Sequence, residues 1–577
     1  MEKRLLLVFA LTFLVIIVFQ PLLKKYLPQP PTPAPETHSA VQQPAPLANA
    51  GNTQILAPAS GVTKQASTEV ETVVENDLYR ITFSNRGGQV KSWILKKFDD
   101  DTGKPLDLVH GVAAARYGYP LSLWTYDETL RNKLSSALYV ASASGRLNAP
   151  SQLTFEYADS EVAVRKTFHF DSSYVLNVET SVLDKGAQIS AFPMWPAGFG
   201  DELTPASYAA SRIEYHNEES TEHSYGVFPK LTDRLTIKQV SGGHTVTGPL
   251  NWAGVVDQYF AAVFIPEDAQ DAALVMQRNS IEIPKDLQKP NPQDMSKTDV
   301  LGAAVGNLHG PTVERMFVGP KALNVVEAVP LPSSAGPIDL RDLVNFGTFG
   351  IIARPLFLWL RWTHAHIVPN WGWAIVIQTL IITAALLPLR ISSMKSALKM
   401  QKIQPQMNSI KEKYKKYTMR DPRKQEMNQE IADLMKREGV SPAGGCLPLI
   451  IQMPFLFAYY SMLNASLDLR HAHWLWISDL SSRDPYFLLP IALVVSMIIT
   501  QRMTPAAGMD PQQQKMMNLM MPLMMGFIFF NLAAGLNLYY AESNLVGIAQ
   551  QVVMSRTSLG REMRELAQKR ARKKDKK

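Results

Sequence analysis

The chain has 577 residues, which is enough for several structural units, and its formal net charge is +7 at pH 7. Cys446 is the only cysteine, which excludes an intramolecular disulfide and a metal cluster built from cysteines. The phosphate-binding motif GxxxxGK[ST] does not occur, so nucleotide-driven work is not expected, and no cofactor is predicted.

Residues 1–26 are predicted to form an N-terminal transmembrane anchor. Met1-Glu2-Lys3-Arg4 precedes the apolar run Leu5–Phe19, and no small-x-small cleavage site follows it. Residues 27–70 are rich in Pro, Ala, Gln and Thr, which is typical of a disordered linker.

In residues 71–340, apolar and polar residues alternate over short segments that are separated by turn signals, as in β-strands. In Leu78–Ser84, Tyr79, Ile81 and Phe83 share one face, and Asn85–Gly88 then turns the chain into a second apolar segment. Tyr174–Val182 alternates in the same way. This texture predicts a large antiparallel β-sandwich.

Residues 341–369 predict an amphipathic helix in the membrane interface. The apolar run 349–367 is interrupted by charged residues and a proline, and Phe357, Trp359 and Trp362 are candidate anchors. The alternative is a helix packed on the β domain.

Residues 370–554 contain five apolar runs of roughly membrane-spanning length, and a bilayer core of about 30 Å needs about 20 residues. The runs are Trp371–Leu389, Cys446–Ala465, Tyr486–Met503, Met516–Leu532 and Leu536–Met554. With the anchor they make a transmembrane bundle of six spans.

The insert 391–445 is strongly polar and predicts a cytoplasmic helical hairpin. Its apolar residues recur at helical spacing along two arms: Ile403, Met407, Ile410, Tyr414 and Tyr417, then Met427, Ile431, Leu434 and Met435. Asp421-Pro422 is a start signal for the second arm and Gly439 a stop signal. Six cations crowd the tip end: Lys411, Lys413, Lys415, Lys416, Arg423 and Lys424. They are either a solvated face or a contact site for nascent chains or lipid headgroups.

Positive charge sets the topology. The insert has 12 Lys and Arg against 6 Asp and Glu, and the tail 555–577 has 10 against 3. The positive-inside rule therefore places both in the cytoplasm, with both termini inside and the β domain outside. The tail is either a plain topology signal or a contact for the ribosome, and basic segments of this kind also suit anionic lipids.

Polar residues recur within the apolar runs. Thr379, Thr383 and Arg390 fall near one helix face, and Gln452 lies between two prolines. The last run carries Asn537, Tyr540 and Asn544 on one stripe and Glu542 on another. Gln378 lies off the first line. Each residue alone is typical of hydrogen bonding between helices. The set, spread over three spans, favours a polar groove for a substrate.

Ordered short motifs then resemble the YidC family of membrane protein insertases in its long Gram-negative form. They are Asn370-Trp371-Gly372, Pro388-Leu389, Gln404-Pro405, Gly444-Gly445-Cys446-Leu447-Pro448, Gln452-Met453-Pro454, Asp484-Pro485-Tyr486, Leu538-Tyr539-Tyr540 and Ser543-Asn544-Leu545. The resemblance implies a hydrophilic groove open to cytoplasm and lipid, with Thr379 and Tyr540 where a substrate helix slides. It also implies that the β domain is a β-supersandwich and that this domain and the linker 27–70 lie in the periplasm. The family usually carries an arginine at the position of Thr383, and Arg390 is the candidate replacement.

The leading hypothesis is therefore a multidomain, non-enzymatic inner-membrane insertase and chaperone, working on nascent membrane proteins alone or with the Sec translocon. The alternative is a small-solute transporter or channel, which would require repeats that the sequence lacks. A sugar-acting periplasmic enzyme is a third class. Its candidate residues, His216, Glu218, Glu219, Glu222 and His223, look like a solvated loop.

Overall fold

The computed structural model describes residues 63–202, 207–217, 232–285, 294–332, 338–417, 421–439, 447–503, 511–557, 561–562 and 565. The predicted anchor 1–26, most of the linker 27–70 and most of the tail 555–577 lie outside these residues. The chain forms two compact units. The first holds the residues up to Val256 with Ala262–Val318, and the second holds Gly319–Pro330 and the residues from Ala335 onward, with two short exchanged segments.

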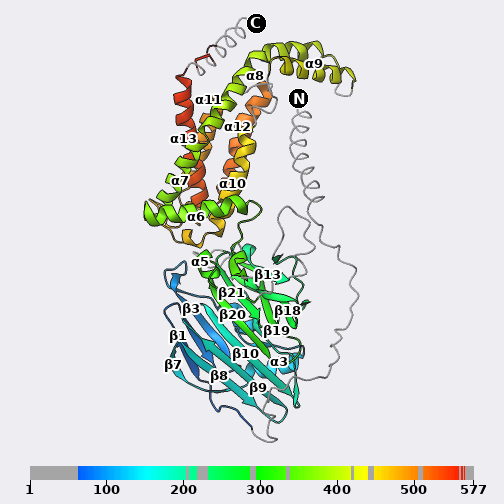
Figure 1. The fold of residues 1–577 in the computed structure, drawn as a ribbon, viewed down its shortest axis with the longest axis vertical. Coiled ribbons are helices and arrows are strands. Elements are labelled where there is room, and N and C mark those ends of the chain that lie inside the picture. The colour runs from blue at the N-terminus through cyan, green and yellow to red at the C-terminus, as the bar shows by residue number, and fades with distance from the viewer. Residues whose placement is uncertain are drawn as a thin grey trace. The chain divides into compact units, whose positions relative to one another are not determined.

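The first unit is built from three sheets, drawn in Figure 1 from blue to green. In strand order, the first sheet comprises β4 (Pro105–Asp107), β3 (Gln89–Asp99), β2 (Tyr79–Ser84), β1 (Glu71–Glu75) and β7 (Gly145–Asn148). The second comprises β14 (Asp233–Thr236), β13 (Arg212–Asn217), β16 (Leu250–Val256), β17 (Phe260–Pro266), β20 (Thr312–Pro320), β10 (Val175–Asp184), β9 (Val162–Phe170), β8 (Ser151–Ala158) and β6 (Val140–Ala141), with β11 (Ala187–Gln188) paired to β10. The third comprises β15 (Thr245–Thr247), β18 (Ala272–Pro284), β19 (Met295–Asn307), β12 (Phe192–Trp195) and β5 (Leu123–Trp124). Outside these sheets, β21 (Pro330–Leu331) pairs with β22 (Ile338–Asp339), and α2 (Gly111–Tyr117) and α3 (Glu128–Ser136) lie between strands.

The predicted alternation places one face of β2 in the core. Tyr79, Ile81 and Phe83 are at most 1 % exposed. Phe83 lies 5.2 Å from the ring of Phe168 in β9 and 5.9 Å from that of Phe155 in β8, so the first sheet packs on the second. Each buried aromatic side chain contributes about 1.5–3 kcal/mol relative to exposure. The β-sandwich prediction is confirmed by this packing.

One strand pair departs from the predicted antiparallel arrangement. β7 pairs with β1 in parallel, with Val73 opposite Arg146. A parallel neighbour needs a long crossover rather than a hairpin, and the chain between these strands supplies it through β2–β6 and α3. Alternation of side chains carries no information on strand direction, so the sequence pattern missed this pair.

Lys166 and Glu314 are among the ionisable side chains that are buried in the first unit. The Lys166 ammonium donates to the carbonyl oxygens of Gly87 (2.9 Å), Gly88 (2.8 Å) and Leu121 (2.6 Å), and burial lowers the pKa of Lys166 to about 7. Glu314 on β20 is 1 % exposed, and within the described residues neither of its carboxyl oxygens has a hydrogen-bond partner. Burial therefore raises the pKa of Glu314 well above its ordinary value.

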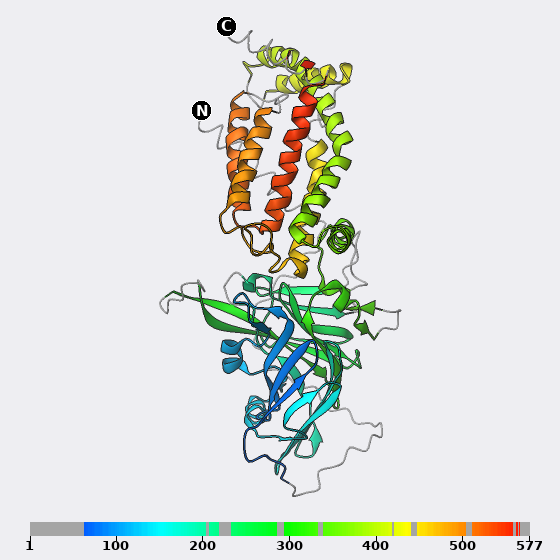
Figure 2. The same ribbon diagram turned by 90° about the vertical axis from the view of Figure 1, so that its left-hand side faces the viewer.

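The second unit is helical. Its helices are α5 (Leu323–Val326), α6 (Gly350–His366), α7 (Trp371–Ala385), α8 (Leu387–Lys413), α9 (Arg423–Arg437), α10 (Leu447–Ala465), α11 (Leu488–Met503), α12 (Pro511–Phe529) and α13 (Ala534–Ser555). Figures 1 and 2 show α7, α10, α11, α12 and α13 running side by side, with α6 across one end and the α8–α9 hairpin at the other. Among the described residues, no helix combines the length and the apolar character that crossing a membrane demands.

The first apolar run ends earlier than its composition indicated. α7 stops at Ala385, and α8 begins at Leu387 and continues through the start of the polar insert to Lys413. Pro388 explains the boundary, because a proline lacks the N–H that would bond to the preceding turn, yet it fits the first turn of a new helix. The boundary predicted at residue 390 therefore falls inside α8.

The hairpin follows its predicted seam. Ile403, Met407 and Leu434 are at most 5 % exposed and form one cluster, with Ile410 and Ile431 packed against it. The second arm begins at Arg423, one residue later than predicted, although the Asp421 carboxylate accepts the Arg423 N–H at 3.0 Å as an N-cap would. Gly439 follows the helix end with φ of +61°, as expected for a stop signal.

The helix predicted within residues 341–369 is present as α6, and it packs on α10 and α7. Of its candidate anchors, Trp362 is 52 % exposed, whereas Phe357 is 3 % exposed and lies 5.6 Å from the ring of Phe346. The interpretation of Phe357 as a membrane anchor is therefore wrong, because its ring is used inside the unit.

Candidate functional site

The predicted groove residues on α7 are buried threonines whose hydroxyls bond within their own helix. Thr379 is 0 % exposed and donates to the Ile375 carbonyl at 2.7 Å, and Thr383 is 3 % exposed and donates to the Thr379 carbonyl at 2.5 Å. Such bonds to the preceding turn satisfy a hydroxyl without a partner helix. Thr383 therefore offers no free donor to a substrate, and it carries no charge.

Arg390 lies at the start of α8, and its guanidinium reaches α13. Its Nη1 donates to the Gln550 side-chain oxygen at 3.1 Å, and the Gln550 amide in turn donates to the Thr383 carbonyl at 3.4 Å. Gly547 leaves room for this approach, because a Cβ at that position would lie 2.7 Å from Nη1 and the guanidinium would have to shift. Arg390 and Thr383 thus meet the same residue, Gln550, which the sequence analysis did not single out.

A polar connection between four helices was also missed by the sequence. Gln378, which lay off the predicted line, is fully buried and donates to the Leu356 carbonyl of α6 at 2.9 Å. The Tyr459 hydroxyl of α10 donates to the other side of the Gln378 amide at 2.7 Å. The Tyr459 ring stacks on Tyr539 of α13, with 3.9 Å between centroids and 13° between planes. An amide within an apolar run is a signal for such a bond, but only helix packing identifies its partners.

The stripe on α13 separates in the structure. Tyr540 is half-buried, its ring packs edge-on against Phe529 at 4.8 Å, and within the described residues its buried hydroxyl has no partner. Asn544 is half-buried one turn further on. Asn537 is fully buried and donates to the Phe529 carbonyl at 3.0 Å, so it closes the end of α12 and is not part of a polar face.

Glu542 was predicted to lie on a different stripe from the groove candidates. In the structure it contacts Thr379, which is one of those candidates. Its carboxyl interacts with the Thr379 side chain, which also interacts with the Tyr459 hydroxyl. The second carboxyl oxygen, Oε2, is buried and has no hydrogen-bond partner in the described part of the chain. The backbone of Gln452 lies in α10, and its side chain is outside the described residues.

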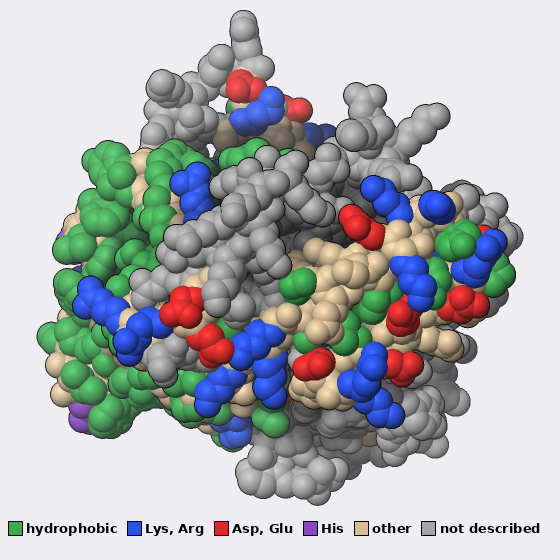
Figure 3. All heavy atoms as spheres, turned by 90° about the horizontal axis from the view of Figure 1, so that it is seen from above, with side chains coloured by type: hydrophobic (Ala, Val, Ile, Leu, Met, Phe, Trp, Pro, Cys, Tyr) green, Lys and Arg blue, Asp and Glu red, His purple; other side chains and the backbone are tan. Residues whose placement is uncertain are grey.

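The hairpin cations differ in their surroundings. Lys413 pairs with Glu430 at 3.2 Å, and Arg423 pairs with Asp421 at 3.1 Å and covers the Tyr417 ring at 4.0 Å. The remaining cations are Lys411, Lys415 and Lys416, which are exposed, and Lys424, which is half-exposed. Seen from above, Figure 3 shows Lys and Arg side chains interspersed with Asp and Glu over much of this view. The part of this face that the structure describes therefore carries both signs of charge and is not uniformly basic.

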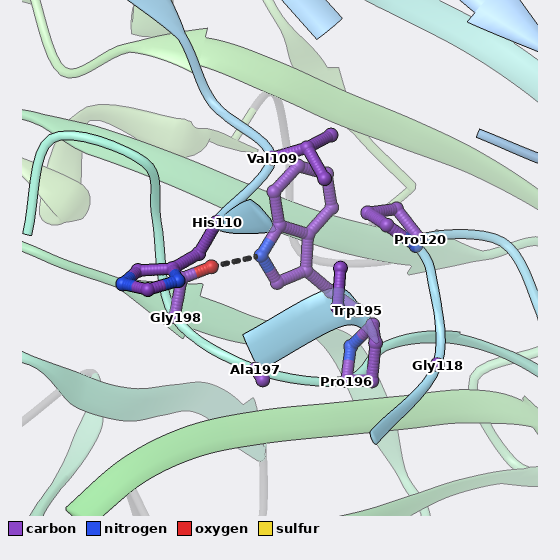
Figure 4. Close-up of a pocket in the computed structure, with 9 residues that line it drawn as sticks. Val109, His110, Gly118, Pro120, Trp195, Pro196, Ala197 and Gly198 are labelled. Atoms are coloured by element: carbon purple, nitrogen blue, oxygen red, sulfur yellow. Dashed lines mark hydrogen bonds between the residues drawn. The ribbon is translucent and has the colours of Figure 1, made fainter. Parts of the chain in front are cut away.

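The first unit contains a narrow crevice between side chains, drawn in Figure 4, which is too tight to admit a water molecule. His110 is the one titratable group in its lining, and the Trp195 indole donates to the Gly198 carbonyl at 2.7 Å beside it. The His110 Nδ1 accepts from the Ala113 N–H at 3.2 Å, so the neutral ring donates from Nε2 to the Tyr208 hydroxyl, 2.8 Å away. Burial lowers the pKa of His110, which keeps this ring uncharged. The lining offers no carboxylate to pair with the imidazole for acid–base chemistry.

His216 is not part of a solvated loop. It lies on β13, is 6 % exposed, and bonds through Nδ1 to the Asn251 side chain at 3.0 Å. The loop interpretation is wrong for His216, because the strand continues further than the polar sequence indicated. Glu218, Glu219, Glu222 and His223 lie outside the described residues.

Comparison with known proteins covers both units. Residues 71–359 match the family model of the YidC periplasmic domain, and residues 362–561 match that of the 60Kd inner membrane protein. A membrane protein insertase YidC of Geobacter sulfurreducens is 32 % identical over 493 residues, 83 % of this chain and 85 % of the relative. Another, of Geotalea uraniireducens, is 30 % identical over 96 % of this chain and 99 % of the relative. A crystal structure of an active YidC insertase with its first transmembrane domain resolved aligns with a TM-score of 0.34 and 18 % identity, covering 86 % of this chain and 95 % of that one.

The chain therefore belongs to the YidC family of membrane protein insertases. The resemblance drawn from its ordered motifs is confirmed. The family is one of inner-membrane insertases and not of enzymes.

Proposed function

We propose that this protein inserts newly made membrane proteins into the bacterial inner membrane and helps them to fold, alone or with the Sec translocon. Family membership along nearly the whole chain is the observation that carries this proposal. Burial of the client's apolar helix in lipid supplies the driving force, because apolar surface leaves water and the helix satisfies its own backbone groups.

We infer a layout of six spans with both termini in the cytoplasm. Residues 1–26 form the anchor, 27–70 the periplasmic linker, 71–340 the periplasmic β domain, 341–369 the interfacial helix, 370–554 the insertase core with its hairpin 391–445, and 555–577 the basic tail. The charge of the hairpin and tail supports this orientation. The five core helices after α6 and outside the hairpin have 15 to 22 residues, so at 1.5 Å per residue they are about 22–33 Å long.

We propose that the client's hydrophilic segment enters along α7, α8 and α13. The residues assigned to this path are Thr379, Thr383, Arg390, Gln452, Tyr540 and Asn544. The half-buried guanidinium of Arg390 beside α13 and the unpartnered hydroxyl of Tyr540 support the assignment among the described residues. Thr383 is neutral and its hydroxyl is bonded within its own helix. Arg390 is therefore the residue among the six that supplies positive charge.

We propose that the hairpin and the tail contact the ribosome and anionic lipid headgroups. Lys411, Lys415 and Lys416 support this role, because they are exposed and no ion pair with a described acidic residue holds them. Lys413 and Arg423 are paired within the hairpin, and we expect them to contribute less to such contacts.

The test is insertion by the purified protein in liposomes. A short single-span client with a small translocated tail is added, and protease protection of the tail is measured against empty liposomes. Protection well above the empty-liposome level is expected. If the protein gives no protection with or without added translocon, while the same vesicles support solute flux, the protein is a transporter and the proposal fails.

A further inference from the structure

The inference concerns the charge of the client segment and rests on the proposed function. Glu542 is the ninth residue of the 22-residue helix α13, so it lies near the middle of that helix. Gln550, the partner of Arg390, follows eight residues later, which is about 12 Å along the helix axis. Glu542 and the point where Arg390 of α8 contacts α13 therefore lie at different levels along α13.

The surroundings of Glu542 leave part of its carboxyl unused. The Glu542 carboxyl lies beside Thr379 and Tyr459, whose side chains bring neutral hydroxyl groups. The Arg390 guanidinium bonds at the level of Gln550, and in the described part of the chain no Lys or Arg pairs with Glu542. A carboxyl oxygen that is buried without a partner costs free energy, and such groups in membrane helices mark places where a ligand or client group binds.

The chemistry of the free oxygen selects its partner. A carboxyl oxygen accepts hydrogen bonds, and the strongest donors to it are the ammonium of lysine and the guanidinium of arginine. A client carboxylate brings no N–H group and is repelled when both groups are ionised. No arginine stands at position 383 to reverse this preference, since Thr383 is neutral and bonded within its own helix.

We propose that Glu542 is a specificity-determining residue, which makes the middle of the α7–α13 path favour client segments that carry a basic side chain. Arg390 acts at the level of Gln550, near the other end of the path, where it attracts the acidic groups of an entering client. The two residues thus shift the choice of client in opposite directions.

The experiment uses the full-length protein in liposomes without a membrane potential, so that the potential itself does not sort charges. Three single-span clients differ at one tail position, which carries Lys, Gln or Asp. Protease-protected fractions are compared for the unaltered protein, Glu542→Gln, Glu542→Asp and Glu161→Gln. Glu161 is an exposed acid of the β domain and controls for loss of one negative charge.

The unaltered protein, Glu542→Asp and Glu161→Gln are expected to insert the Lys tail about tenfold better than the Asp tail, the lower end for one hydrogen bond to a charged group. In Glu542→Gln the ratio of inserted Lys tail to inserted Asp tail is expected to approach one. An equal ratio in the unaltered protein and Glu542→Gln would overturn the inference, as would a preference for Asp. Loss of all three tails in Glu542→Gln alone would show a structural role and also overturn it. No insertion of any tail by the unaltered protein, with or without added translocon, would instead refute the proposed function, and the specificity with it.

Discussion

The bond between Tyr459 and Gln378 gives a sharp test of how the helical unit holds together. Tyr459→Phe removes one oxygen atom, and the ring can keep its stack on Tyr539 at 3.9 Å. The deleted hydroxyl donates at 2.7 Å to the Gln378 amide oxygen, which is then left without a donor in a fully buried place. The change therefore isolates one polar contact between α7 and α10.

The expected cost follows from the burial of both partners. A buried acceptor left unsatisfied costs about 1–3 kcal/mol in water-soluble proteins, whereas bonds between membrane helices average about 0.6 kcal/mol with a maximum near 1.7 kcal/mol. We expect about 1 kcal/mol for Tyr459→Phe, because Gln378 has no alternative donor among the described residues at that oxygen. A unit of this size then loses about 2–4 °C in its thermal midpoint.

The assay is thermal unfolding of the full-length protein in detergent, with Tyr460→Phe as the matched control. Tyr460 is the next residue of α10 and is 40 % exposed, so the loss of its hydroxyl is expected to cost almost nothing. In a double-mutant cycle, Gln378→Leu and Tyr459→Phe should together cost less than the sum of the single changes. Equal shifts for Tyr459→Phe and Tyr460→Phe, or strict additivity in the cycle, would refute the reasoning.

Three further predictions test other parts of the molecule. Arg390→Ala is expected to lower insertion of clients with acidic tails several-fold and to leave neutral tails unchanged, measured by protease protection; unchanged insertion of acidic tails would remove Arg390 from the path. Glu314→Gln should raise the thermal midpoint at pH 7.5 but not at pH 4. Burial raises the pKa of Glu314 above its ordinary 4.5, so the folded protein keeps a proton that the unfolded chain releases, and the free energy of unfolding falls as pH rises through 4.5. The same gain at both pH values would contradict this. Leu434→Ala should lower the free energy of unfolding of the hairpin by about 2–5 kcal/mol, since Leu434 is 5 % exposed in the hairpin core. Amide hydrogen exchange should then become faster in α8 and α9 but not in α13, and an equal increase in all three helices would count against an independent hairpin core.

Local sequence patterns predict much of the fold. The apolar period of the insert predicted the buried seam of Ile403, Met407 and Leu434, and alternation in β2 predicted the buried face of Tyr79, Ile81 and Phe83. These patterns succeed because the periods of helix and strand are properties of the backbone itself, so one face is apolar wherever one face is buried.

The pairing of side chains between elements could not be predicted in this way. The sequence set Gln378 apart from the polar line and Glu542 on a separate stripe, yet Gln378 joins α6 to α10 and Glu542 faces Thr379. Which residues meet depends on the rotation of each helix about its axis and on its axial offset from its neighbours. Those two quantities are set by packing in three dimensions, and a single helix's sequence period does not contain them.

The chain by itself thus determined its helices and strands, the apolar seam of its hairpin and, through its ordered motifs, its family. The tertiary structure alone decided that Thr383 bonds inward, that Arg390 reaches α13 past Gly547, and that one oxygen of Glu542 stays without a partner in the described residues. The physical reason is that backbone preference and apolar period act within a segment, whereas the satisfaction of a buried polar group depends on what other segments bring to it.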